Sequence, residues 1–146
     1  IMKRKQFIQQ CGFACAGAGV LMAWLQSCAT QKSVTATYDK ETLILPLTEF
    51  YTLKNGEKKW NRTMIVRNEN VDFPIAVYHL KEDDYRALLL RCTHQGNELN
   101  VYGDLITCNA HGSEFSNNGQ VLQGPANTPL QSYKVTVDDK NVYIQL

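Results

Sequence analysis

Two short segments of this chain each hold a cysteine and a histidine at a spacing that could bind metal. The first is Cys92-Thr93-His94-Gln95-Gly96 and the second is Cys108-Asn109-Ala110-His111-Gly112-Ser113. Thirteen residues, 95–107, separate His94 from Cys108. Each segment offers one thiolate and one imidazole from a turn, so two facing turns supply two sulfur and two nitrogen ligands. Such a set suits a tetrahedral Zn²⁺ ion or an iron–sulfur cluster.

The residues that follow the ligands favour the cluster. Gly96 and Gly112 allow the backbone to approach closely and to adopt positive φ. Ser113 adds a hydroxyl beside the site that can donate a hydrogen bond to a cluster sulfide. A structural zinc site made of the same four residues is the main alternative. A disulfide between Cys92 and Cys108 is a further one, but it leaves both neighbouring histidines unexplained.

The two motifs, C-T-H-x-G and C-x-x-H-G-S, resemble those of the Rieske family, and Gly124-Pro125-Ala126 resembles the proline loop of that family. The similarity extends over roughly residues 43–146. It implies a [2Fe–2S] cluster in which two cysteines bind one iron and two histidines bind the other. The implied ligands are Cys92, His94, Cys108 and His111. The implied residues around the cluster are Gly96, Gly112, Ser113, Phe115 and Pro125.

The resemblance also implies how the reduction potential is set. Ser113 matches a family position whose hydroxyl bonds a bridging sulfide and raises the potential. Phe115 stands where high-potential members carry a tyrosine that bonds a ligand sulfur. Asn97 and Ala110 stand where those members carry a disulfide between the two loops. We therefore expect a potential below the top of the range of roughly −150 to +300 mV that Rieske centres span.

The N-terminus has the pattern of an export segment. Lys3-Arg4-Lys5 form a positive region, residues 6–31 carry no charge, and Leu25-Gln26-Ser27-Cys28 resembles a bacterial lipobox. Cys28 is therefore the expected lipidation site. An uncleaved spanning helix is the alternative, because ~20 apolar residues can cross a bilayer. The sequence leaves open whether export uses the general or the twin-arginine route.

The expected organisation has three parts. Residues 1–28 are a signal, lipoprotein or anchor segment, and residues 29–41 are a polar linker without a hydrophobic period. Residues 42–146 form the Rieske domain, in which residues 91–126 make up the cluster-binding subdomain.

Alternating apolar residues and turn signals predict an all-β domain, an antiparallel β-sandwich with the small cluster-binding subdomain inserted in it. Asn55-Gly56 predicts a two-residue hairpin turn, and Pro46 predicts an edge position for the first strand. His79 has no cysteine beside it and is predicted to be structural or exposed. The predicted strands are residues 43–47, 50–53, 58–66, 75–78, 85–90, 99–102, 105–107, 133–137 and 142–146.

Charge limits the possible partners. The chain has 146 residues, with 15 Lys and Arg and 14 Asp and Glu. Without residues 1–27, which hold three of the basic residues, 12 basic (15 − 3) and 14 acidic residues remain, a net charge of −2. No basic patch indicates binding of nucleic acid.

Together these features predict an electron-transfer protein with no catalytic site of its own. We expect it to be tethered to a bacterial inner membrane, with its domain on the periplasmic face. The expected partner is a respiratory, quinol-oxidising complex of the cytochrome bc type or a cytochrome, with a quinol as a candidate electron donor. Three alternatives stay open: the small subunit of an exported molybdenum oxidoreductase such as arsenite oxidase, a soluble oxygenase ferredoxin, and a structural zinc module that binds a partner.

Overall fold

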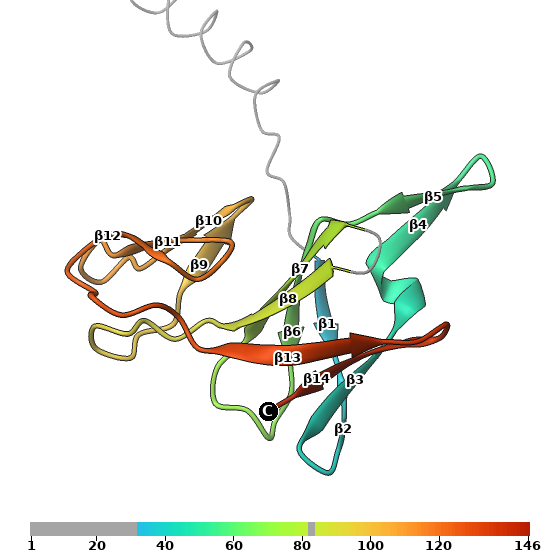
Figure 1. The fold of residues 1–146 in the computed structure, drawn as a ribbon, viewed down its shortest axis with the longest axis horizontal. Coiled ribbons are helices and arrows are strands. Elements are labelled where there is room, and N and C mark those ends of the chain that lie inside the picture. Colours follow the sequence, from blue (N-terminus) through green and yellow to red (C-terminus); the bar gives the residue numbers. More distant parts are fainter. Residues whose placement is uncertain (1–31, 82–83) are drawn as a thin grey trace, which may run out of the picture. The chain divides into compact units, whose positions relative to one another are not determined.

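The computed structural model describes residues 32–81 and 84–146. Its large sheet has the strand order β1-β6-β7-β8-β13-β14-β3-β2, and its small sheet has the order β12-β11-β10-β9 (Figure 1). The large sheet comprises β1 (Lys32–Thr35), β2 (Thr37–Asp39), β3 (Thr42–Pro46), β6 (Thr63–Arg67), β7 (Ile75–Lys81), β8 (Asp84–Leu89), β13 (Ser132–Val137) and β14 (Asn141–Gln145). The small sheet comprises β9 (Asn100–Tyr102), β10 (Leu105–Thr107), β11 (Glu114–Ser116) and β12 (Val121–Gln123). A separate hairpin comprises β4 (Tyr51–Lys54) and β5 (Glu57–Trp60), preceded by the 3-10 helix η1 (Leu47–Phe50).

The all-β prediction is confirmed. Neighbouring strands are antiparallel throughout the sheets, except that β1 pairs with β6 in parallel. The small sheet is inserted in sequence between β8 and β13, and Figure 1 shows it at one side of the large sheet. In the part of the chain that the structure describes, no helix is long and apolar enough to cross a bilayer.

Strands β7 and β8 separate two hydrophobic cores. Along β7, Ile75 and Val77 belong to the first core, whereas Ala76 and Tyr78 belong to the second. This follows from the two-residue period of a strand, which sends successive side chains to opposite faces. Burial on both faces explains why this stretch reads as a continuous apolar run.

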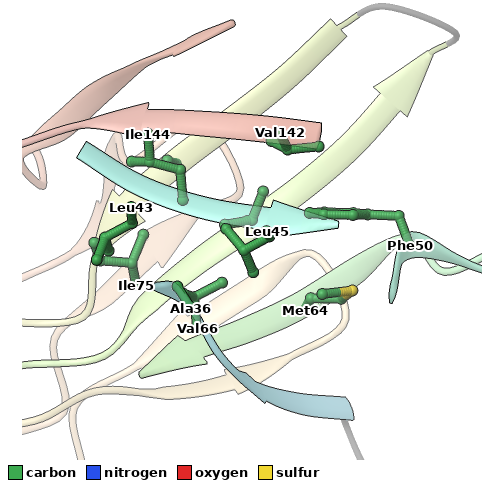
Figure 2. Close-up of a cluster of buried hydrophobic side chains, with 11 residues drawn as sticks. Ala36, Leu43, Leu45, Phe50, Met64, Val66, Ile75, Val142 and Ile144 are labelled. Carbon is green, nitrogen blue, oxygen red and sulfur yellow. The ribbon is translucent and has the colours of Figure 1, made fainter. Parts of the chain in front are cut away.

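The first core fills the space between β3, β14, β6 and β7. Figure 2 shows Leu43 and Leu45 beside Ile144 and Val142, with Met64 and Val66 beyond them. The full set of buried side chains is Ala36, Leu43, Leu45, Phe50, Met64, Val66, Ile75, Val77, Ala87, Val142 and Ile144.

The second core lies under the small sheet and contains both cysteines of the predicted site. Leu88 on β8 points into this core, and Leu90 and Cys92 continue the same alternation beyond the end of the strand. Its buried members are Ala76, Tyr78, Leu88, Leu90, Cys92, Leu99, Ile106, Cys108, Phe115, Ala126 and Leu130.

The predicted hairpins are confirmed. Asn55 (φ 55°) and Gly56 (φ 84°) both have positive φ and join β4 to β5, as a two-residue hairpin turn requires. The strands predicted around Gly103-Asp104 pair as β9 and β10, and those near the C-terminus pair as β13 and β14.

Three expectations about strands were wrong or incomplete. The strand with Pro46 is internal, because β3 lies between β14 and β2; Pro46 is tolerated there as the last residue of the strand. The polar linker predicted for residues 29–41 is wrong over 32–39, where β1 and β2 pair with β6 and β3 and bury Ala36. Strands β11 and β12, of three residues each, were not predicted. The lipobox cysteine and the start of the linker lie outside the described residues.

Leu45 and Leu53 provide a matched test of the first core. Leu45 is fully buried, whereas Leu53 on β4 is 69% exposed. Leu45→Ala should lower the free energy of unfolding by about 2–5 kcal/mol, because it removes buried methyl groups and leaves a cavity. Leu53→Ala should change it by less than about 0.5 kcal/mol. Chemical denaturation of the cluster-loaded protein measures both, and equal losses would contradict the packing described here.

Candidate metal centre

The first ligand loop follows β8 and is closed by its own backbone. Cys92 N–H donates to the Asn97 carbonyl (2.8 Å), and Gly96 N–H donates back to the Cys92 carbonyl (2.8 Å). Gly96 has φ 76°, a value that glycine adopts without strain. A Cβ atom at this position would also lie 3.2 Å from the Arg91 side chain. The two hydrogen bonds and the glycine hold the loop in a tight turn.

The second ligand loop, between β10 and β11, repeats the same hydrogen bonds at the same offsets. Cys108 N–H donates to the Ser113 carbonyl (2.8 Å), and Gly112 N–H, at φ 78°, donates to the Cys108 carbonyl (2.9 Å). The histidine stands two residues after the cysteine in the first loop and three residues after it in the second. The two loops therefore share one backbone scaffold but present their imidazoles from different positions.

Two of the four predicted ligands are buried cysteines, and the other two are histidines whose rings contact each other. Cys92 and Cys108 are free thiols, each 2% exposed, within the second core. The rings of His94 and His111 have centroids 4.9 Å apart and lie nearly perpendicular, at 89°. His94 is half-buried and His111 is exposed, so the sulfur pair lies inside and the imidazole pair near the surface.

A buried nitrogen atom at this site is available to bind a metal. His94 Nδ1 is buried and has no hydrogen-bond partner among the described residues. Burying such an atom is costly unless a partner or a metal satisfies it. Within residues 32–81 and 84–146, no group of three or more His, Cys, Asp and Glu side chains is arranged to hold a single metal ion.

Ser113 joins the second ligand loop to the proline loop. Its side chain is completely buried, and Oγ accepts a hydrogen bond from Ala126 N–H at 3.0 Å. Since the oxygen acts as the acceptor in this bond, the hydroxyl proton remains free to be donated elsewhere. This arrangement suits the predicted bond from Ser113 to a cluster sulfide.

Phe115 is also fully buried in the second core and carries no hydroxyl.

Two further hydrogen bonds tie the proline loop to the ligand loops. Thr93 Oγ1 donates to the Thr128 carbonyl (2.7 Å), and Gln123 Nε2 donates to the Gly112 carbonyl (3.0 Å). Neither bond could be predicted from the sequence, because each joins residues that are distant in sequence. Pro125 itself is exposed at the surface between these attachments.

An ion pair joins the β9–β10 hairpin to the segment before β6. The Arg62 guanidinium donates to both carboxylate oxygens of Asp104, at 3.0 and 2.7 Å, and Asn117 donates to the same carboxylate. The bonds from Arg62 lower the pKa of Asp104, so the pair stabilises the fold above the unfolded pKa of about 3.9 and weakens as the pH falls. Both side chains are more than half exposed, which limits the contribution to under about 1 kcal/mol. Burial raises the pKa of the neighbouring Tyr78 hydroxyl, and the charge of Asp104 adds to the shift.

His79 takes no part in the candidate centre. Its ring lies between Trp60 and Tyr85, with both centroid distances at 4.6 Å. This position agrees with the structural role predicted for it.

Comparison with known proteins decides the family. Residues 49–134 match the model of the Rieske [2Fe–2S] domain, which covers more than half of the chain. This chain belongs to the Rieske [2Fe–2S] family. Its cofactor is therefore a [2Fe–2S] cluster rather than zinc, and its function is Rieske-type electron transfer.

Several known Rieske subunits are similar in sequence to parts of this chain. The cytochrome b6-f complex iron-sulfur subunit of Chlorobaculum tepidum is 32% identical over 88 residues, which are 59% of this chain and 48% of that protein. The corresponding subunit of a Synechococcus strain is 43% identical over 53 residues, which are 35% of this chain and 31% of that protein. The chain thus spans half or less of the length of these relatives.

A solved Rieske structure shows the same fold. The crystal structure of the cyanobacterial plasma membrane Rieske protein from Synechocystis PCC 6803 aligns with a TM-score of 0.51 and 26% identity. The alignment covers 58% of this chain and 87% of that protein.

Ser113→Ala tests the junction between the second ligand loop and the proline loop. The free energy of unfolding should fall by about 1–3 kcal/mol, because the buried Ala126 N–H loses its acceptor. The midpoint potential should also fall, because a lost bond to a cluster sulfur destabilises the more negative reduced state. Denaturation and protein-film voltammetry measure the two effects.

Ser116→Ala is the matched control for this variant. Among the residues that the structure describes, Ser116 Oγ accepts only from the exposed backbone N–H groups of Asn118 and Gln120, which water can satisfy. The control should leave the potential unchanged. A Ser113 variant with the stability and potential of the control would show that the hydroxyl has neither role.

Proposed function

We propose that Cys92 and Cys108 bind one iron of the cluster and that His94 and His111 bind the other. The observation that supports this proposal is the pair of loops with matching backbone bonds, which carry two buried free thiols and two imidazoles whose rings lie 4.9 Å apart. When bound, the cluster supplies a one-electron couple whose potential is raised because two neutral imidazoles replace two thiolates.

The residues around these ligands orient them and exclude water. Thr93 and Gln123 tie the ligand loops to the proline loop, and Phe115 and Leu99 pack among the cysteines in the second core. The exposed ring of His111 offers a short path for an electron between the cluster and a docked partner. The potential should lie below the top of the Rieske range, because Phe115 cannot donate a hydrogen bond to a ligand sulfur.

The proposed partner is a membrane-bound, quinol-oxidising complex of the cytochrome bc type. Support comes from the relatives named as cytochrome b6-f complex iron-sulfur subunits, which are 32% and 43% identical to parts of this chain. We further propose that the domain lies on the periplasmic face of a bacterial inner membrane, held by a lipid on Cys28. The lipobox-like segment and the charged start of the sequence support this placement.

Metal analysis tests the assignment of the ligands. Natively expressed protein should contain about two irons and two labile sulfides and give a Rieske-type EPR signal after reduction. Cys92→Ser and His111→Ala should each abolish the signal and destabilise the small sheet, because metal-binding free energy contributes to folding. His79→Gln is the matched control and should keep both iron and signal. Full iron content in the His111 variant with an unchanged spectrum would contradict the assignment.

Intact-mass analysis tests the proposed anchor. Protein extracted from membranes should begin at Cys28 and carry two or three acyl chains, since a single chain gives only marginal attachment. Cys28→Ala should accumulate as an uncleaved precursor, while its cluster spectrum stays the same. If the mature protein retains residues 2–27, the lipid anchor is contradicted and the spanning anchor is supported.

A further inference from the structure

The β4–β5 hairpin extends from the domain with almost no burial of its own. It forms a two-stranded sheet apart from the two larger ones, and its side chains are exposed except for the half-buried Tyr51. Leu53 is 69% exposed and Trp60 is 37% exposed. No side chain of either strand belongs to the two cores, so core packing does not explain the exposed Leu53.

The hairpin is the basic part of an otherwise acidic domain. Residues 51–60 hold Lys54, Lys58 and Lys59 against Glu57, a net charge of +2. Residues 28–146 have a net charge of −2, so the remainder outside the hairpin carries −4 (−2 − 2). None of the three lysines forms an ion pair with any residue that the structure describes. Their charges are therefore available to an anionic surface.

Aromatic contacts hold the hairpin in a defined position. Trp60 packs against Tyr51 (centroids 5.1 Å apart) on the hairpin and against His79 (4.6 Å) on β7. The Lys58 ammonium lies 4.6 Å from the centre of the Tyr51 ring. The hairpin is thus fixed to the large sheet by ring contacts and presents Leu53 and its lysines outward.

The point where the N-terminal segment enters the domain lies beside the base of the hairpin. The Lys32 ammonium donates to the Glu49 carbonyl (2.9 Å) and pairs with the Glu49 carboxylate (2.7 Å). Glu49 stands two residues before β4 begins. Three residues separate Cys28 from Lys32, so their Cα atoms can lie at most about 14 Å apart. A lipid on Cys28 would therefore keep the hairpin close to the bilayer.

We propose that the β4–β5 hairpin docks on anionic phospholipid headgroups of the membrane that holds the anchor. Lys54, Lys58 and Lys59 contact phosphates from the two faces of the hairpin. Leu53 enters the interfacial region, and Trp60, on the same face as Leu53 and Lys58, lies at its edge, where tryptophan is favoured. This inference rests on the proposed lipid at Cys28. Figure 1 shows the hairpin and the small sheet at opposite sides of the domain, so docking orients the cluster loops away from the hairpin's contact with the membrane.

Tryptophan fluorescence tests the docking directly. A chain cleaved before Cys28 keeps Trp60 as its only tryptophan, since the other is Trp24. The full, cluster-loaded protein is reconstituted into phosphatidylcholine vesicles with brominated acyl chains, with or without phosphatidylglycerol. Trp60 should be quenched more strongly, and its emission shifted to the blue, when phosphatidylglycerol is present. Added salt should reverse this difference, because it screens exposed charges.

The variant with Lys54→Gln, Lys58→Gln and Lys59→Gln should lose the part of the quenching that depends on phosphatidylglycerol. A matched variant removes the same charge outside the hairpin, through Lys40→Gln, Lys134→Gln and Lys140→Gln. It should keep the quenching that depends on phosphatidylglycerol. Trp60→Phe identifies any signal from Trp24. Equal quenching of the hairpin variant and the control would overturn the proposal.

Co-sedimentation with pure phosphatidylcholine vesicles separates this inference from the anchor. Protein that stays on these vesicles without a phosphatidylglycerol-dependent change at Trp60 keeps its anchor but overturns the docking. Protein that binds only phosphatidylglycerol vesicles, through the hairpin lysines, supports the docking without the anchor. The hairpin variant could instead keep its quenching and transfer electrons more slowly to its redox partner. This result would overturn lipid docking and show that the lysines bind an acidic protein.

Discussion

The alternating burial of β7 and β8 is the constraint on which the rest of the domain depends. Odd-numbered side chains such as Val77 and Ala87 enter the first core, and even-numbered ones such as Tyr78 and Leu88 enter the second. A shift of one residue in this register would exchange the two sets and turn Cys92 away from the site. The packing of a whole sheet therefore determines the direction of the side chain of one proposed ligand.

Both loops of the site have the same pattern of backbone hydrogen bonds. Cys92 and Cys108 each donate their backbone N–H to the carbonyl five residues later, and their carbonyls accept from a glycine N–H four residues later. The proline loop then joins the two turns through Ser113 and Thr93. Rigid loops of this kind favour rapid electron transfer, because the ligands need little rearrangement between the two redox states.

The sequence predicted those parts of the molecule that local chemistry determines. The Cys/His motifs, the Asn55-Gly56 turn and the alternating strands are each encoded within a few residues. It could not predict β1 and β2, whose polar residues become strands only by pairing with β6 and β3. Bonds such as those from Thr93 to Thr128 and from Arg62 to Asp104 were equally hidden, because their partners are 35 and 42 residues apart.

Nitrogen spectroscopy of the reduced protein tests the central claim, that two histidines bind the cluster, most directly. Protein labelled with ¹⁵N only at histidine should show two strongly coupled ¹⁵N nuclei by pulsed EPR. His79→Gln should leave both couplings in place, because its ring lies between Trp60 and Tyr85. Absence of any strongly coupled histidine nitrogen, or the loss of one coupling in the His79 variant, would contradict the assignment of His94 and His111.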